Sequence, residues 1–190
     1  NAGLSVTLVE NDAQSLQRAL AGIDDTYAAS VAKGRLAAAE RDACRARLRG
    51  SIDMQDFGSA DLVVEAVFED MALKRRIFAD LDRICRPGAI LSTNTSALDI
   101  DQIAAATSRP QDALGLHFFS PAHVMKLLEI VRGKQTSVEV MVSAMALAKS
   151  IRKIGVVAGN CDGFIGNRML IGYRREDRKS TRLNSSHQSV

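Results

Sequence analysis

Several residue types and patterns are scarce in this sequence. Its 190 residues include no tryptophan, two tyrosines and three cysteines, and no apolar run approaches the roughly 20 residues that span a membrane. Cys44, Cys85 and Cys161 are odd in number and widely spaced, which fits neither a disulfide framework nor a CxxC metal site. We therefore expect a protein of a reducing compartment that is not secreted, with no membrane span and no metal.

Excess charge of one sign is also lacking from most of the chain. The formal net charge of +3 comes entirely from residues 174–190, where five basic side chains stand against two acidic ones. Residues 1–173 therefore offer no basic surface for nucleic acid, and we expect no nucleic-acid partner. With 46% hydrophobic and 25% charged residues, the composition is that of a globular protein with one core, or one domain and the start of another.

Short apolar runs alternate with segments of helical period along residues 1–160. The run Ser5–Glu10 is β-branched and is followed by an amphipathic helix over Ala13–Val31. This alternation predicts an α/β fold with a doubly wound parallel sheet. The other predicted helices are Leu36–Leu48, Glu69–Ile84 and Val138–Ser150, and the other predicted strands include Ala60–Val67, Ala89–Leu91, Ala113–Leu116, Lys126–Glu129 and Ile154–Val157.

Two further predicted helices carry an apolar stripe. Residues spaced three or four apart lie on one helix face, so we expect the stripe to pack inward. The inward residues would be Leu73, Ile77, Leu81 and Ile84 in the first of these helices, and Val142, Met145, Leu147 and Ala148 in the second.

The residues best suited to chemistry gather between Ser92 and Glu129. His117 ends one short apolar run, Glu129 ends another, and Ser96 follows a buried-looking strand. Oxidation of an alcohol by hydride transfer needs a base, a group that holds the base in one tautomer, and donors around the oxygen. Taken singly, these residues are better explained as a packed histidine, a surface carboxylate and part of a helix cap at residues 94–96.

Three strings taken together are more specific than any single residue. NTS at 94–96, LHFFSPAHVMKLLE at 116–129 and NCDGFIGNRML at 160–170 resemble the 3-hydroxyacyl-CoA dehydrogenase family, most closely the dehydrogenase part of multifunctional fatty-acid β-oxidation enzymes. The resemblance covers about residues 1–173. It implies a Rossmann-like fold and NAD-dependent oxidation of L-3-hydroxyacyl-CoA to 3-ketoacyl-CoA. Ser120, where many relatives have asparagine, is typical of the multifunctional, peroxisomal-like branch.

The resemblance implies catalytic roles for four residues. His117 would take the hydroxyl proton, and Glu129 would orient the imidazole and stabilise its charged form. Ser96 and Asn167 would hydrogen-bond the reacting oxygen of the substrate. His123 is a rival base, although its place in a turn favours a structural role.

The same resemblance implies residues that hold the cofactor and the CoA portion of the substrate. A carboxylate that ends the second strand of a dinucleotide fold can accept both ribose hydroxyls, so position 10 favours NAD over a phosphorylated ribose. A capping glutamate explains position 10 equally well, and a solvated lysine explains position 33. The implied NAD contacts are Glu10, Glu69, Lys74 and Asn94, and the implied substrate contacts are Thr26, Lys33, Ser96 and Asn167.

A glycine-rich phosphate loop is absent, since Gly3 is the only glycine before Glu10. In the family, a G-x-G-x-x-G loop stands about 20 residues upstream of this acid, so we expect a first strand and turn to precede residue 1. Residues 1–160 would form the NAD-binding domain, and residues 161–173 would begin an all-helical C-terminal domain. Residues 174–190 resemble translated sequencing-adapter material, and we expect them to be foreign.

Alternatives to an active enzyme of this family are an inactive fragment, a non-catalytic relative and another NAD-dependent hydroxy-acid dehydrogenase. The intact set of Ser96, His117, Glu129 and Asn167 argues against a non-catalytic relative. Besides an acyl-CoA substrate, we expect a homodimer or a multifunctional chain. The compartment would be the cytoplasm of a bacterium, or the peroxisome or mitochondrion of a eukaryote.

Overall fold

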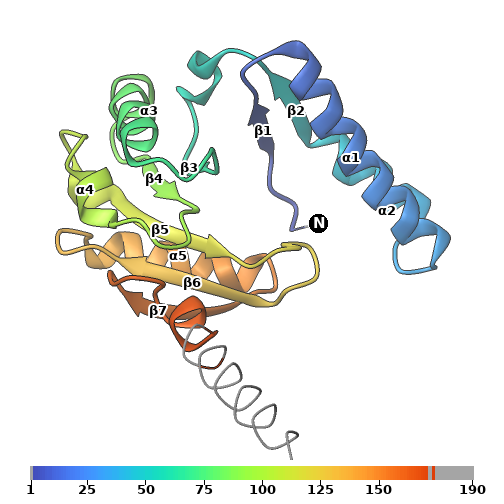
Figure 1. Cartoon of the computed structure of the whole chain (residues 1–190). Helices are drawn as coiled ribbons and strands as arrows, with labels where there is room; N and C mark the ends of the chain where they lie inside the picture. The colour runs from blue at the N-terminus through green and yellow to red at the C-terminus, as the bar shows by residue number, and fades with distance from the viewer. Residues whose placement is uncertain (1, 171–172, 174–190) are drawn as a thin grey trace, which may run out of the picture. The chain divides into compact units, whose positions relative to one another are not determined.

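The computed structural model describes residues 2–170 and Tyr173 (Figure 1). The chain divides into two compact units. The first comprises Asn1–Asp61 with Arg83–Ala89, and the second comprises Leu62–Asp82 with the residues from Ile90 onward. The predicted foreign tail, residues 174–190, lies outside the described residues.

The first unit is built on two parallel strands, β1 and β2. Asp12 begins the first helix because its carboxylate accepts the N–H of Ser15 at 2.8 Å, which satisfies one of the free donors of a helix start. The elements in chain order are β1 (Val6–Val9), α1 (Ala13–Ala32), α2 (Ala38–Ala46), β2 (Leu48–Ser51) and the 3-10 turn η1 (Met54–Phe57).

The predicted helix over Leu36–Leu48 is wrong at its C-terminal end. α2 ends at Ala46, and Leu48 already pairs with Val6 of β1. α1 packs directly on β2, since a Cβ added at Gly50 would lie 3.0 Å from a methyl group of Leu16. Pairing with β1 and packing against α1 therefore decide the conformation of this segment, and neither is visible in its local sequence.

The second unit is a five-stranded sheet with the order β3-β4-β5-β6-β7. All neighbouring strands run parallel except β5 and β6, which run antiparallel. The alternation of helices with a mostly parallel sheet confirms the predicted α/β class. The elements are β3 (Leu62–Glu65), α3 (Met71–Ile84), β4 (Ile90–Thr93), α4 (Ile100–Ala104), the 3-10 turn η2 (Pro110–Asp112), β5 (Ala113–Phe118), β6 (Leu127–Arg132), α5 (Val138–Ser150) and β7 (Ile154–Gly159).

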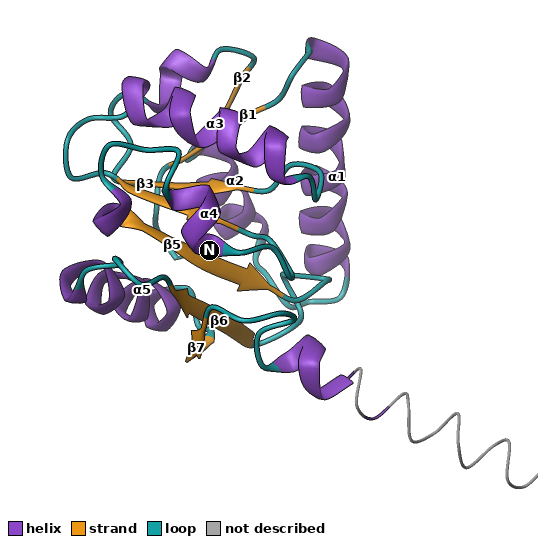
Figure 2. Ribbon diagram, turned by 60° about the vertical axis from the view of Figure 1, so that its left-hand side comes forward, coloured by secondary structure: helices purple, strands orange, loops and turns teal. Residues whose placement is uncertain are grey.

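Helices cover both faces of the sheet around β5 and β6. Successive side chains of a strand point to opposite faces, so β6 contributes to two cores. One core lies against α5, which runs alongside β6 in Figures 1 and 2, and contains Leu114, Leu116, Leu128, Ile130, Val140, Ala144 and Ala148. The other lies against α4 and contains Ile100, Val131, Ala158 and Phe164.

The buried faces of α3 and α5 differ in part from the prediction. Leu81 and Ala148 are buried as expected, whereas Val142 and Met145 are exposed. A Cβ added at Gly155 of β7 would lie 3.0 Å from the Cβ of Ala148, so small residues bring α5 close to the sheet. The residues that are buried are Lys74, Phe78 and Leu81 in α3, and Val140, Ala144 and Ala148 in α5.

The chain after β7 turns into a further helix, as predicted. Gly163 has a φ of +67°, a left-handed conformation that glycine adopts without steric cost, and residues 166–170 are helical. That this helix begins an all-helical domain stays a prediction. Among residues 2–170, no helix combines the length and the hydropathy that a membrane span requires.

Candidate active site

His117 and Glu129 form a buried pair across two strands. The antiparallel register of β5 and β6 places the two residues directly opposite each other, where side chains on the same face come within contact distance. His117 Nδ1 lies 2.6 Å from Glu129 Oε2, and the exposed fractions of the two residues are 6% and 0%. Glu129 was predicted to end an apolar run, but it lies within β6, where the register fixes its partner.

The second carboxylate oxygen of Glu129 is also held in place. Glu129 Oε1 accepts the backbone N–H groups of Ile165 at 3.0 Å and Gly166 at 2.8 Å. These N–H groups belong to the start of the helix at residues 166–170, where backbone donors lack partners within the helix. The close approach requires a glycine, because a Cβ at position 166 would lie 2.6 Å from Phe119 Cζ.

This arrangement selects one tautomer of His117. Glu129 Oε1 accepts two backbone N–H groups, and an ionised carboxylate can only accept, so we assign the proton between Oε2 and the imidazole to Nδ1. Nε2 is then left with a lone pair that can take a proton. A histidine held in this way has the geometry that a general base needs, with its orientation fixed by a carboxylate partner.

Aromatic side chains surround the imidazole. The ring centroid of His117 lies 4.5 Å from that of Phe119 and 5.9 Å from that of Phe164. The rings exclude water from the pair, which strengthens its electrostatic interaction. The reading of His117 as a packed core histidine therefore describes its surroundings correctly but omits its buried carboxylate partner.

The loop after β4 is tied to the strand that carries His117. Asn94 Oδ1 accepts the N–H of Phe118 at 2.8 Å, and Asn167 Nδ2 donates to the Ser96 carbonyl at 3.2 Å. Ser96 and Asn167 are thus brought together with the end of β5. Residues 94–96 are not the cap of the next helix, because Asp99 caps α4.

Glu69 is the acceptor on which this loop converges. Its Oε1 accepts from the Thr95 hydroxyl at 2.6 Å, the Ser96 N–H at 2.8 Å and the Ser96 hydroxyl at 3.1 Å. Burial alone would raise the pKa of Glu69, but the hydrogen bonds from Thr95 and Ser96 and the charge of Lys74 outweigh it and lower the pKa. Glu69 therefore presents a carboxylate beside Ser96.

Lys74 is buried, and its partner Glu65 was not predicted. Lys74 Nζ donates to Glu65 Oε1 at 2.8 Å and to the Val67 carbonyl at 3.3 Å, and it lies 3.5 Å from Glu69 Oε2. Only 1% of each of the side chains of Lys74 and Glu65 is exposed. The sequence signal for Glu65 was its position as a charged residue at the end of the apolar run that forms β3.

The remaining predicted site residues belong to the other compact unit. Glu10, Thr26 and Lys33 belong to the first unit, whereas the His117 and Glu69 contacts lie within the second. Glu10 directly follows β1, as predicted, and its N–H is donated to the Ser51 carbonyl at 3.1 Å. The Thr26 hydroxyl donates to the carbonyl of Gly22 in its own helix.

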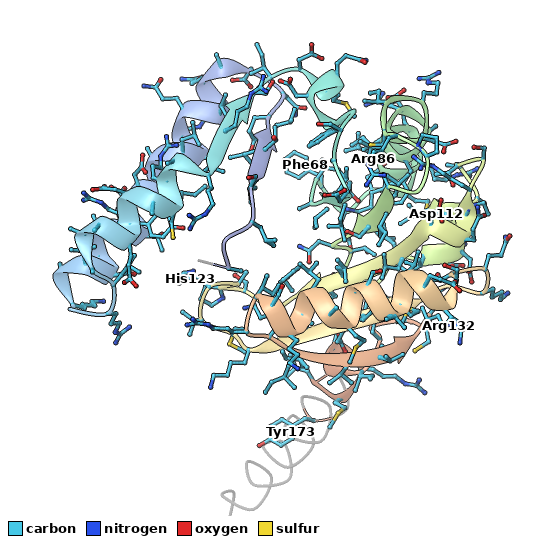
Figure 3. All side chains as sticks on the ribbon, turned by 180° about the vertical axis from the view of Figure 1, so that it is seen from behind. Phe68, Arg86, Asp112, His123, Arg132 and Tyr173 are labelled. Carbon is cyan, nitrogen blue, oxygen red and sulfur yellow. The ribbon has the colours of Figure 1, made fainter. Side chains whose placement is uncertain are left out.

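His123 lacks the features of a base in the described part of the chain. It is exposed in the segment between β5 and β6, and no ion pair with a described carboxylate is present. Figure 3 shows it at the opposite end of β6 from Arg132. Residues 2–170 also contain no group of three or more His, Cys, Asp or Glu side chains placed to hold a metal ion.

A mostly parallel sheet covered by helices, with a buried histidine and carboxylate paired across β5 and β6, is the arrangement of a Rossmann-like dehydrogenase. Residues 1–161 match the family described as 3-hydroxyacyl-CoA dehydrogenase, NAD binding domain, and the chain belongs to this family.

Relatives with known names agree with this assignment. The chain is 49% identical over 171 residues to the peroxisomal bifunctional enzyme of Cavia porcellus, covering 90% of this chain and 23% of that protein. The structure of FadB2 from M. tuberculosis matches with a TM-score of 0.92 at 34% identity, over 96% of this chain and 65% of that one. The structure of 3-hydroxybutyryl-CoA dehydrogenase from Escherichia coli matches with a TM-score of 0.85 at 38% identity, over 86% of this chain and 35% of that one. The chain thus spans about a quarter of the length of the Cavia porcellus enzyme.

Proposed function

We propose that the chain carries the NAD-binding and proton-transfer part of an enzyme that oxidises L-3-hydroxyacyl-CoA to 3-ketoacyl-CoA in fatty-acid β-oxidation. The observation that carries this proposal is the buried pair of His117 and Glu129, in which Nε2 of the imidazole is left to take a proton. Membership of the 3-hydroxyacyl-CoA dehydrogenase family supports the substrate class.

The residues present fit NAD. Glu10 stands where β1 ends, and no described side chain or N–H group donates to its carboxylate, so both oxygens can accept ribose hydroxyls. Asn94 uses Oδ1 for Phe118, which leaves its amide N–H groups to donate. Glu69 offers Oε2 as a further acceptor, because its hydrogen bonds to Thr95 and Ser96 are all made by Oε1 and Lys74 Nζ lies 3.5 Å from Oε2. When bound, NAD supplies the acceptor for the hydride that leaves the substrate carbon.

His117 removes the hydroxyl proton of the substrate. Its Nε2 takes the proton while Nδ1 stays bonded to Glu129. The imidazole becomes a cation in this step, and the carboxylate at 2.6 Å stabilises that charge. In the reverse direction, the same nitrogen returns the proton to the ketone oxygen.

Asn167 would donate to the reacting oxygen, as would Ser96 once its hydroxyl, which donates to Glu69 here, turns to the substrate. The Ser96 hydroxyl and the Asn167 amide are neighbours, since Asn167 Nδ2 donates one N–H to the Ser96 carbonyl. The second N–H of that amide can donate to the substrate oxygen. Preorganised donors at this position stabilise the charge that shifts onto the oxygen during proton and hydride transfer.

The substrate, assembly and compartment follow as parts of the same proposal. Thr26 and Lys33 would contact the CoA portion, with the Lys33 ammonium serving a phosphate as a point charge. The complete enzyme would be a homodimer or part of a multifunctional chain. Relatives named as peroxisomal and glyoxysomal enzymes favour the peroxisome if the source is a eukaryote.

The proposal is tested by assaying hydride transfer in the full-length protein. We expect NAD reduction with L-3-hydroxybutyryl-CoA, and no reduction above background with the D-isomer. Free L-3-hydroxybutyrate distinguishes the alternative hydroxy-acid dehydrogenase, which would use the free acid at least as well as the thioester. Absence of turnover with every acyl-CoA chain length would refute the proposed activity.

A further inference from the structure

Lys74 and Glu65 form an ion pair that is almost completely buried. Each side chain is 1% exposed, and the two charged groups are 2.8 Å apart. Removing two charges from water costs several kcal/mol per ion, so a buried ion pair often stabilises a protein no more than apolar residues of similar size would. Stability alone therefore does not account for this pair, and we look for its role in the residues that it positions.

Glu65 links the ends of β3 and β4. Its Oε1 accepts the Val67 N–H at 2.7 Å, and its Oε2 accepts the Thr93 hydroxyl at 2.7 Å. Its backbone carbonyl accepts the Asn94 N–H at 2.7 Å. Glu65 thus holds Val67 after β3, Thr93 at the end of β4 and Asn94 after β4.

The contacts of Glu65 continue to Ser96 by two routes. On one route, Thr93 Oγ1 accepts the Thr95 N–H at 3.3 Å, which fixes the residue before Ser96. On the other, Lys74 Nζ lies between the two carboxylates, 2.8 Å from Glu65 and 3.5 Å from Glu69. Glu69 in turn accepts both the N–H and the hydroxyl of Ser96.

The position of the Lys74 ammonium depends on the charge of Glu65. Among the described residues, Glu65 and Glu69 are its two anionic partners. Without the charge of Glu65, the ammonium would be drawn fully to Glu69, because a buried cation needs a close anion. Glu69 would then give up part of its hydrogen bonding to the Ser96 loop and its free oxygen.

We propose that Glu65 is a positioning residue for the cofactor side of the site. Its buried carboxylate holds Lys74 away from Glu69, and it anchors the strand end that leads to Asn94 and Ser96. Lys74 connects Glu65 to Glu69 in this arrangement. The proposal rests on the proposed function, since it assumes that NAD binds beside Glu69 and Asn94.

Glu65→Gln and the double variant Glu65→Gln/Lys74→Met in the full-length protein test this role. The single variant should weaken NADH binding, measured by calorimetry, about tenfold and should lower Tm. The double variant removes the unpaired ammonium and should recover most of the Tm. Its NADH binding should stay at least fivefold weaker than in the wild type and weaker than in Lys74→Met alone, which loses the predicted Lys74 contact with NAD but keeps Glu65. The pH dependence of kcat, which reports His117, should be unchanged in both.

Asp82→Asn is the matched control. Asp82 lies on the same helix as Lys74 and accepts from the Ser108 N–H at 2.7 Å and from Arg109 Nε at 2.9 Å, but it has no contact with Glu69. This variant should lower Tm and leave NADH binding within twofold of the wild type.

Recovery of NADH affinity together with Tm in the double variant would overturn the proposal, because Glu65 would then be merely structural. If the single variant does not fold, the NADH affinity of the double variant alone tests the proposal. Wild-type protein that binds no NADH would refute the proposed function and the positioning role together. Wild-type binding that the Glu65 variants retain would refute the positioning role alone.

Discussion

Replacing Glu129 with glutamine separates the charge of this side chain from its shape. In the native protein, Oε1 accepts two backbone N–H groups and Oε2 accepts from His117 Nδ1. Glutamine has one oxygen and one NH₂ group. If its oxygen keeps the N–H groups of Ile165 and Gly166, its NH₂ group faces Nδ1 as a donor. His117 must then accept at Nδ1 and carry its proton on Nε2, where it can no longer act as a base.

The expected loss can be estimated from this change of tautomer. An aspartate-to-asparagine change that imposes the wrong histidine tautomer in a serine protease lowers kcat about 10⁴-fold. We therefore expect kcat of Glu129→Gln to fall by about 10³- to 10⁴-fold. The buried hydrogen bond to a charged group also becomes a neutral one, which should lower the free energy of unfolding by about 1 kcal/mol.

Three measurements on the full-length protein test this expectation. The first is kcat with saturating L-3-hydroxyacyl-CoA and NAD, the second is the affinity for NADH, which should stay within threefold of the wild type, and the third is urea unfolding. Glu139→Gln, at an exposed position at the start of α5, is the control and should match the wild type in all three. A Glu129→Gln variant with kcat within tenfold of the wild type would refute the reasoning.

Three further predictions concern other parts of the chain. Gly166→Ala should cost about 1–3 kcal/mol of stability by overpacking against Phe119, which a lower urea midpoint would reveal; an unchanged midpoint would show that the ring moves aside freely. Glu10→Ala should raise the KM for NAD with no change in the KM for acyl-CoA, and steady-state kinetics that show both rising would contradict its role at the ribose. The hydrogen bond from Asn160 is the main cause of the lowered pKa of Asp99. A pKa that is lower in the folded state gives stability that is present above the unfolded value of about 3.9 and is lost as pH falls through the folded value. Asp99→Ala should therefore destabilise the protein more at pH 7 than at pH 3 in urea unfolding, and equal effects would show that the charge plays no part.

Elements with strong local signals could be predicted from the sequence. α5 was predicted with its observed bounds, Val138–Ser150, because it carries a long apolar segment of helical period. β2 was missed because Leu48–Ser51 has no strand pattern of its own and gains its structure from pairing with β1. Helix faces were less predictable, since close packing selected alanines over the larger Val142 and Met145.

Most residues of the candidate site could be predicted from the sequence, but the contacts between them could not. The family resemblance pointed to His117 and Glu129, but only the antiparallel register of β5 and β6 explains why they meet. Nothing in the spacing of the sequence predicts that direction, because the rest of the sheet is parallel. Lys74 was expected at the cofactor. Its burial depends on a contact with Glu65, a strand residue nine positions earlier in the chain.

The most direct test of the central claim is His117→Gln in the full-length protein, with turnover and NADH binding measured side by side. Loss of a positioned general base lowers turnover by about 10²- to 10⁴-fold, while the contacts proposed for NAD are untouched. The account therefore predicts that kcat with L-3-hydroxyacyl-CoA falls by at least about 100-fold and that NADH binds as it does to the wild type. Wild-type turnover by this variant would contradict the account, because another group would then be removing the proton.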